Sequence, residues 1–240
     1  MASAQGGLQM VIGDWSKVLV AAATLALAAC GSEAPAEAVE DGALAGVEQE
    51  VPVMGPQKRI LAFGDSLFAG YGVGLENSYP AKLQNALRAR GTNAIVVNAG
   101  VSGDTTAAGR QRIAYTLDSQ AVKPDLVIVE LGGNDILRSL PPTETRANLD
   151  AILTEIRKRD IDVLVMGMRS PPNLGSVFSS EFDDIYPELA NEHDAELVPF
   201  FLESIYTKRN LFQSDRIHPT VEGIEELVTD TVDEVEDALD

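Results

Sequence analysis

The sequence predicts one α/β domain in which a parallel five-stranded sheet lies between two layers of helices. Five short apolar segments recur along the chain, and longer segments with a helical spacing of apolar residues separate them. This alternation is typical of parallel strands joined by crossover helices. We therefore predict a three-layer α/β/α domain at residues 58–240, with strands at residues 59–63, 94–98, 126–131, 163–168 and 196–200.

Two of the intervening segments show the single apolar face of a surface helix. The first stripe recurs at i, i+3, i+4 and i+7, and the second lies near the end of the chain; they are formed by Leu149, Ile152, Leu153 and Ile156, and by Ile224, Leu227 and Val228. The acidic run at residues 230–240 opposes the dipole of this last helix, so we expect the helix end to fray.

Composition limits the classes of function that this chain can serve. Its 240 residues include 18 Lys and Arg against 37 Asp and Glu, a formal charge of -19, and no basic stripe offsets that charge locally. This balance argues against nucleic-acid binding. A single cysteine and two separated histidines, without a Cys-x-x-Cys or His-Glu-x-x-His pattern, predict no metal site and no disulfide.

The first 29 residues have the pattern of an export signal. Lys17 precedes an apolar run at residues 18–29, which is too short to span a membrane comfortably as a mature helix. The run ends in Leu-Ala-Ala before Cys30, which resembles the signal box of bacterial lipoproteins, so we expect Cys30 to be lipidated. The alternatives are secretory cleavage after Ala28 without a lipid, or an unprocessed core helix.

Residues 30–57 are acidic and lack sustained apolar periodicity, which predicts a flexible linker. This linker is either a tether that lets the domain reach substrates near a membrane or a mere spacer.

Polar or glycine-bearing turns follow four of the predicted strands. Gly64-Asp65-Ser66 follows the first, residues 100–104 the second, residues 132–135 the third, and Asp215 and His218 come after the fifth. Parallel sheets bind their ligands beyond the carboxyl ends of the strands. We therefore expect these turns to meet in one site.

Three of these residues predict nucleophilic catalysis. A serine hydroxyl needs a positioned base, and His218 is the candidate base for Ser66. Pro219 suits the first position of the closing helix and would hold His218 at the helix entrance. Asp215 lies three residues before His218, close enough to bond its Nδ1. Ser66, His218 and Asp215 thus form a candidate Ser-His-Asp set.

Ester cleavage also requires donors aimed at the developing oxyanion. The backbone N–H groups of Ser66 and Gly103 and the side-chain amide of Asn134 are the candidates, because a glycine permits close backbone approach and an amide donates without charge.

Taken together, the four blocks resemble the SGNH, or GDSL, hydrolases. The blocks are Gly64-Asp-Ser-Leu67, the turn at Gly103, Gly132-Gly-Asn-Asp135 and Asp215-Arg-Ile-His-Pro219, and the resemblance covers residues 58–220. It is closest to the subgroup of periplasmic thioesterase I, lysophospholipase L1 and arylesterase. The resemblance implies a flavodoxin-like sheet, serine-dependent hydrolysis of carboxylic esters or thioesters, no cofactor and an exported protein.

Apolar side chains near the predicted site suggest an acyl groove, although core packing explains some of them equally well. They are Leu67, Leu137, Leu174 and Phe178. By contrast, we expect Asp65 and Asp135 to hold turns. We predict no function for His193, which the sequence places at an exposed helix end.

The function predicted first is an exported serine esterase that acts on aryl esters, lysophospholipids or acyl thioesters from a periplasmic, lipid-anchored position. Its predicted partners are the ester substrate and the membrane, with no nucleic acid and no obligate protein. A carbohydrate O-deacetylase is an alternative, although the single tryptophan, Trp15, lies in the signal and no other is available to stack on a sugar. The third candidate function is that of a non-catalytic surface lipoprotein.

Overall fold

The computed structural model describes residues 53–239, which form a three-layer α/β/α domain. Its five strands are all parallel and lie in the order β2-β1-β3-β4-β5. The strands are β1 (Lys58–Gly64), β2 (Ala94–Gly100), β3 (Leu126–Glu130), β4 (Asp162–Met166) and β5 (Glu196–Val198). The predicted fold class is confirmed.

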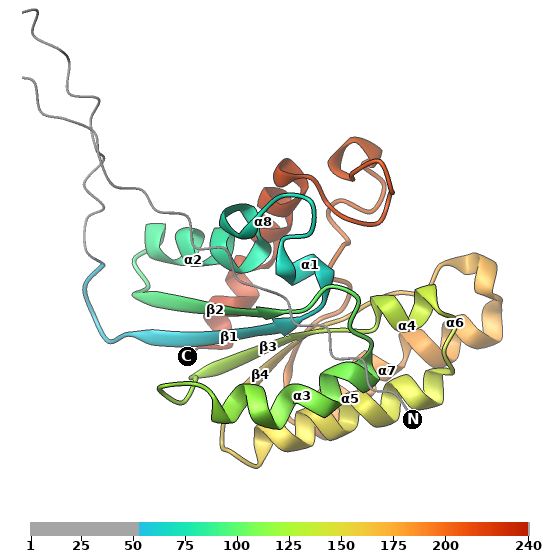
Figure 1. Cartoon of the computed structure of the whole chain (residues 1–240), viewed down its shortest axis with the longest axis horizontal. Coiled ribbons are helices and arrows are strands. Elements are labelled where there is room, and N and C mark those ends of the chain that lie inside the picture. Colours follow the sequence, from blue (N-terminus) through green and yellow to red (C-terminus); the bar gives the residue numbers. More distant parts are fainter. Residues whose placement is uncertain (1–52, 240) are drawn as a thin grey trace, which may run out of the picture. The chain divides into compact units, whose positions relative to one another are not determined.

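Helices cover both faces of the sheet (Figure 1). One face carries α2 (Tyr79–Ala89) and α8 (Val221–Asp237), and the other carries α3 (Thr106–Asp118), α5 (Pro142–Arg157) and α7 (Ile185–Glu192). The remaining short helices are α1 (Ser66–Ala69), α4 (Gly133–Leu137) and α6 (Ser176–Asp183), with 3₁₀ turns at Leu75–Asn77, Pro172–Leu174 and Arg209–Leu211.

The core lies between these layers, and the central strands are buried on both faces. Every residue of β3 is buried, as are the last five residues of β1. Such strands read as continuous apolar runs because helices cover both sides. Both predicted helical stripes are buried, on α5 and α8 respectively.

The sheet ends earlier at β5 than the sequence predicted. Val198 is the last paired residue, and Pro199 follows it. Proline has no N–H to donate to the ladder, which explains the shorter strand.

The acidic end of α8 is helical as far as Asp237, so the expected fraying is wrong. Val232 and Val235 are buried there, and the Thr231 hydroxyl lies 2.7 Å from the Tyr79 hydroxyl in the core. Basic residues also pair with this helix, since Lys82 of α2 contacts Glu225 and Arg90, the residue after α2, contacts Asp233. Tertiary packing therefore outweighs the unfavourable dipole.

The order of the strands creates a crevice at the carboxyl ends of β1 and β3. The chain passes from β1 outward to β2 and then returns to β3 on the other side, so the connections diverge between β1 and β3. In flavodoxin-like sheets this switch point is where ligands bind. None of the helices within residues 53–239 is long and apolar enough to cross a membrane.

Candidate active site

Ser66 is the first residue of α1 and follows the tight turn at the end of β1. The Asp65 carboxylate caps this helix by accepting a hydrogen bond from the Leu67 N–H at 3.0 Å. The turn is tightly packed, because a Cβ atom at Gly64 would lie 2.9 Å from the Glu130 carbonyl oxygen, and one at Gly100 would lie 2.5 Å from the Ala69 nitrogen. The position of Ser66 is thus determined by backbone contacts from both neighbouring strands.

Ser66, His218 and Asp215 form a continuous chain of hydrogen bonds. His218 Nε2 lies 2.8 Å from Ser66 Oγ, and His218 Nδ1 lies 2.7 Å from Asp215 Oδ2. Ser66 and His218 are 152 positions apart in the sequence. The fold brings them together as the sequence analysis expected. This geometry is that of a Ser-His-Asp triad.

The other oxygen of Asp215 holds the turn that carries His218. Asp215 Oδ1 accepts hydrogen bonds from the backbone N–H groups of Ile217 at 2.9 Å and of His218 at 3.1 Å. Partial burial alone would raise the pKa of Asp215, but the hydrogen bonds from His218 and from these N–H groups outweigh it and lower the pKa to about 2. Asp215 is therefore an ionised acceptor at every physiological pH.

Two residues that the sequence analysis did not single out hold His218. The Tyr71 ring lies against the imidazole with 4.2 Å between the ring centroids. The Gln213 backbone N–H donates to the His218 carbonyl at 2.7 Å, and its Nε2 donates to the carbonyls of Tyr71 and Pro219, both at 2.9 Å. The glycine-rich stretch after Ser66 was the available signal for Tyr71.

Asn134 enters the site at the beginning of α4. Its Nδ2 donates to Asp65 Oδ2 at 2.9 Å and leaves one amide hydrogen unused by that bond. Gly132 precedes it with φ +118, and a Cβ there would lie 2.1 Å from the Tyr186 hydroxyl. Only glycine fits this turn, which sets the position of Asn134.

Gly103 lies in the exposed turn after β2, with φ +87. Its carbonyl accepts a hydrogen bond from Arg138 Nη2 at 2.8 Å, which joins this turn to the end of α4. Gly103 is not among the residues that line the cavity beside Ser66, so its role as an oxyanion donor stays a prediction.

Asp65 and Glu130 form a buried carboxyl pair directly behind the turn that carries Ser66. The sequence analysis missed this pair. Glu130, the last residue of β3, has no exposed surface; its Oε2 accepts from the Asp65 N–H at 3.4 Å and its Oε1 has no partner within residues 53–239. Burial, followed by the charge of Asp65, raises the pKa of Glu130 well above its usual range. Burial also raises the pKa of Asp65, but N–H groups of Leu67 and Asn134 oppose that rise. Glu130 therefore keeps its proton to a higher pH than Asp65 does.

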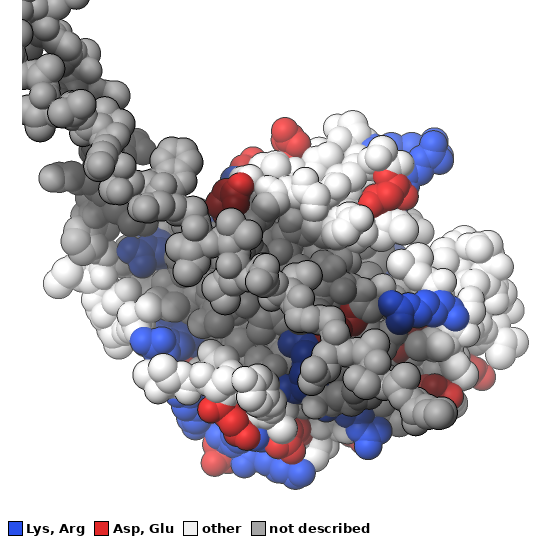
Figure 2. Space-filling model, viewed as in Figure 1, with Lys and Arg blue, Asp and Glu red and all other residues white. Residues whose placement is uncertain are grey.

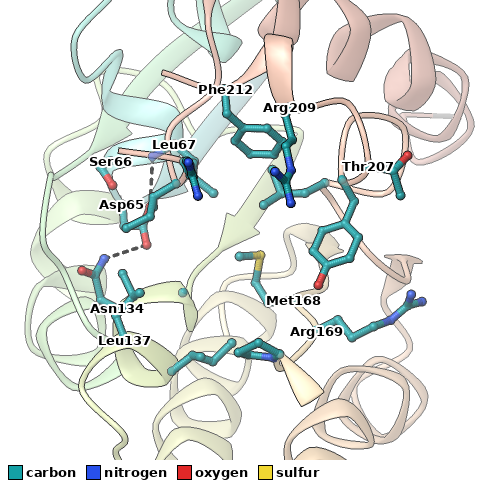
Figure 3. Close-up of a pocket in the computed structure, with 17 residues that line it drawn as sticks. Asp65, Ser66, Leu67, Asn134, Leu137, Met168, Arg169, Thr207, Arg209 and Phe212 are labelled. Carbon is teal, nitrogen blue, oxygen red and sulfur yellow. Dashed lines mark hydrogen bonds between the residues drawn. The ribbon is translucent and has the colours of Figure 1, made fainter. Parts of the chain in front are cut away.

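A cavity of about 640 Å³ opens beside Ser66 and Asn134, and its walls are mainly apolar. Figure 3 shows Leu67, Leu137, Met168 and Phe212 around it. The predicted groove residues Leu67 and Leu137 thus line the cavity. The sequence analysis missed much of the wall between β5 and His218, because that segment has no regular periodicity; it contributes Leu202, Tyr206 and Phe212.

Leu174 and Phe178, in contrast, do not line this cavity. Leu174 is partly buried against the core, and the Phe178 ring stacks on Phe182 of the same helix with centroids 6.0 Å apart. The start of α6 turns Phe178 toward its own helix rather than toward Ser66. Core packing, the alternative explanation, fits these two residues.

Asp135 and His193, which the sequence analysis also considered, have structural partners. Asp135 accepts from the Thr106 N–H at 2.9 Å and from the Thr145 hydroxyl at 3.2 Å, which confirms its role in holding turns. His193 is largely buried and bonds Asp150 at 2.7 Å, so the expectation of an exposed histidine is wrong. Within the described part of the chain, no group of three His, Cys, Asp or Glu side chains is placed to hold a metal ion.

Comparison with known proteins identifies the family. Residues 62–225 match the model of the GDSL-like Lipase/Acylhydrolase family. An arylesterase of Vibrio mimicus is 42% identical over 166 residues, which cover 69% of this chain and 82% of the relative. Thioesterase 1/protease 1/lysophospholipase L1 of Escherichia coli K12 is 40% identical over 160 residues, 67% of this chain and 74% of the relative.

A solved structure agrees with these matches. The crystal structure of AlinE4, an SGNH-hydrolase family esterase, has 60% sequence identity and a TM-score of 0.66, and the match covers 78% of this chain and 99% of that one. The fold, the turn at Ser66 and these similarities agree that the chain belongs to the GDSL-like Lipase/Acylhydrolase family, the SGNH hydrolases.

Proposed function

We propose that this protein hydrolyses carboxylic esters through an acyl-enzyme intermediate formed on Ser66. The observation that carries the proposal is the unbroken chain of hydrogen bonds from Asp215 through His218 to Ser66, at the mouth of an apolar cavity. Relatives named as esterases support the same chemistry.

The ionised Asp215 determines which nitrogen of His218 carries the proton. A carboxylate only accepts, so Nδ1–H faces Asp215 and Nε2 is left to accept the Ser66 hydroxyl proton. As Ser66 Oγ bonds the ester carbonyl carbon, this proton passes to Nε2. His218 then donates it to the departing alcohol or thiol, and a water molecule repeats the sequence to release the acid.

The tetrahedral intermediates need donors for their oxyanion. We assign this role to the backbone N–H groups of Ser66 and Gly103 and to the amide hydrogen of Asn134 that Asp65 does not occupy. In well-studied hydrolases, removing one such donor costs about 2.7–4 kcal/mol of transition-state stabilisation.

The cavity supports an acyl substrate rather than a sugar. Its volume of about 640 Å³ lies within the range of small-ligand sites, roughly 300–1,000 Å³. Apolar walls such as Met168 and Phe212 favour a hydrocarbon chain. Aryl esters, monoacyl lipids and acyl thioesters are the substrate classes that we propose.

We further propose that the chain is exported and anchored through a lipid on Cys30. Support comes from the apolar run that ends in Leu-Ala-Ala-Cys and from the position of the single cysteine. Cys30 and the predicted signal and linker lie outside the described residues, except for the end of the linker at residues 53–57.

Initial rates on p-nitrophenyl acetate, butyrate, octanoate and palmitate test the esterase proposal. Ser66→Ala should lower kcat at least about 10³-fold because no nucleophile remains. Asp215→Asn should lower it about 10²–10⁴-fold, since an amide that donates to Nδ1 favours the wrong tautomer. A preference for octanoate over acetate is the expected specificity, whereas strict acetate preference would favour a deacetylase.

Asp150→Asn is the matched control, because it alters a second Asp–His pair, with His193, away from the cavity. It should leave the rates within about twofold of wild type. Equal losses in Asp150→Asn and Asp215→Asn would overturn the assigned triad.

A further inference from the structure

One arginine of α3 joins the ends of β1 and β2 beside the active site. Arg112 donates from Nη2 to the Gly64 carbonyl and from Nη1 to the Ala99 carbonyl, both at 2.9 Å. Its Nε donates to Asp104 Oδ2 at 2.6 Å, and its guanidinium carbon lies 3.9 Å from the centre of the Phe63 ring. The three nitrogens of one rigid, planar group thus bind two strand ends and the turn after β2.

These contacts close a ring of hydrogen bonds around the Gly103 turn, residues 101–104. The Asp104 N–H donates to the Val101 carbonyl at 3.1 Å and so closes the turn itself. Gly103 is its third residue, with φ +87, where a turn of this kind favours glycine. The Val101 N–H donates to the Gly64 carbonyl at 3.0 Å. That carbonyl therefore holds one end of the turn directly and the other end through the Arg112–Asp104 pair.

The Arg112–Asp104 pair is largely buried, with 20% of the Arg112 side chain and 13% of the Asp104 side chain exposed. Close packing of α3 on the sheet sets the position of Arg112, since a Cβ at Gly109, three residues earlier, would lie 2.5 Å from Leu131 Cδ1. Water and salt screen a partly buried, charge-assisted contact less than an exposed one. The pair therefore restrains the Gly103 turn more firmly than an exposed ion pair would.

The same ring includes the backbone that leads to the nucleophile. The Gly64 carbonyl lies two residues before Ser66, whose N–H is one proposed oxyanion donor, and the N–H of Gly103 is another. Because Arg112 bonds the chain on both sides, it sets the position of one N–H relative to the other. In enzymes, a shift of about 1 Å caused by a remote change can lower the rate about 10²-fold.

We propose that Arg112 is a positioning residue, which holds the Gly103 turn against the start of α1 and so keeps the two backbone N–H groups directed at the same oxyanion. Arg112 does not line the cavity, so it acts through these backbone groups and not by contact with the substrate. This inference rests on the proposed esterase function and adds to it a residue outside the triad on which kcat depends.

Rates on p-nitrophenyl butyrate test the proposal. Arg112→Gln should lower kcat about 10–100-fold and change KM by less than about threefold, because the transition state loses an aligned donor while the cavity keeps its walls. Arg112→Lys keeps the positive charge but has one ammonium group in place of a planar fork, so it should recover only part of kcat. Full recovery by lysine would show that charge alone acts, and would overturn the proposal.

Arg159→Gln is the matched control. Arg159 also bonds a backbone carbonyl, that of Glu155 at 2.9 Å, and a carboxylate, that of Asp118 at 2.8 Å, and 25% of its side chain is exposed. It precedes β4 at the edge of the sheet opposite Ser66. With rates measured well below the thermal unfolding of each variant, its kcat should stay within about twofold of wild type. Equal losses of kcat in the two variants would overturn the positioning role.

Backbone amide NMR separates this proposal from the esterase proposal, because it requires no turnover. In Arg112→Gln the amide signal of Gly103 should shift, and the amide protons of Val101 and Asp104 should exchange with solvent at least about tenfold faster than in wild type. Arg159→Gln should leave these signals unchanged.

The two proposals can then fail independently. An unchanged Gly103 turn in Arg112→Gln overturns the positioning role, while loss of wild-type hydrolysis in Ser66→Ala would still support the esterase. Conversely, a wild-type protein that cleaves no ester contradicts the esterase, while a turn loosened in Arg112→Gln would still assign Arg112 to holding it.

Discussion

The imidazole of His218 is held from three directions, which suits a group that must move a proton in a fixed direction. Asp215 bonds Nδ1, Ser66 lies 2.8 Å from Nε2, and the Tyr71 ring covers one face of the imidazole. Gln213 links the backbone of the loop at Tyr71 to the backbone of the turn that carries His218. Hydrogen bonds and ring packing therefore restrict rotation of the histidine before any substrate arrives.

Glu130 has a different role, because its carboxyl group is buried behind the nucleophile turn and burial raises its pKa. In the unfolded chain the pKa of a glutamate is about 4.3. The folded chain keeps the Glu130 proton to higher pH because burial raises the pKa of this group. The folded state therefore binds more protons above pH 4.3, so the free energy of unfolding falls as pH rises.

We predict that Glu130→Gln removes this fall of the unfolding free energy with rising pH. Glutamine has the same shape and no proton to lose, so the variant should exceed wild type in free energy of unfolding by an amount that grows from about pH 4.5 upward, with a slope of up to about 1.4 kcal/mol per pH unit. Urea unfolding at pH 4.5, 5.5, 6.5 and 7.5 measures it.

Glu155→Gln is a control of opposite sign for this measurement. Hydrogen bonding to Arg159 lowers the pKa of Glu155, so its contribution to stability is present above the unfolded pKa and is lost as pH falls. Replacing it should lower stability near pH 7 and have less effect in acid. Parallel pH profiles for the two variants would contradict the assigned protonation of Glu130.

At the scale of elements, the site depends on turns that admit no side chain. Gly64, Gly100 and Gly132 each approach a neighbouring backbone or hydroxyl so closely that a Cβ would fall within 3.0 Å of it. The first two set α1 against the sheet, and the third sets the start of α4. Ser66 and Asn134 thus keep their relative position through the packing of short helices rather than through their own contacts.

We predict that Gly132→Ala loses both stability and activity. Alanine would adopt φ near +118 with strain and would meet the Tyr186 hydroxyl, so the turn must shift and move Asn134 with it. Gly91→Ala is the control, because Gly91 has φ +98 but nothing within 4 Å.

The control should lose only about 1–2 kcal/mol of unfolding free energy, the cost of a left-handed L-residue, and should keep its kcat. Thermal unfolding and rates on p-nitrophenyl butyrate give both quantities. An active, equally stable Gly132→Ala protein would show that the turn can relax.

On the scale of the whole molecule, charge is spread widely over the described surface. Figure 2 shows acidic and basic side chains interspersed on the visible face, without a continuous basic area. Within the described domain, pairs such as Lys82–Glu225 and Arg146–Glu192 join neighbouring helices. Each exposed pair contributes about 0–1 kcal/mol, so the apolar core carries most of the stability.

The processing of the full chain provides the prediction at this scale. Mass spectrometry of protein isolated from a bacterial membrane fraction should find a mature chain that begins at Cys30 and carries a diacylglyceryl group. Cys30→Ser should move the protein to the soluble fraction or leave the signal uncleaved, because serine has no thiol to receive the lipid. An unmodified Cys30 in the mature chain would exclude the anchor.

The sequence by itself determined the fold class, the five strands to within a few residues, and the identity of Ser66, Asp215, His218 and Asn134 as the residues that meet. It could do so because these signals are local: apolar runs, glycine-bearing turns, and a carboxylate three residues before a histidine. The alternation of strands and helices then placed all the turns at one edge of the sheet.

Only the tertiary structure decided which groups surround these residues. In the sequence, nothing distinguishes Glu130 from an exposed glutamate at the end of a strand. Pairing of β1 with β3 buries it behind Asp65. The segment before His218 has no period, but it forms a wall of the cavity with Leu202 and Phe212, while Phe178 packs on its own helix instead. Burial and side-chain contact depend on pairs far apart in the chain, and local patterns do not encode them.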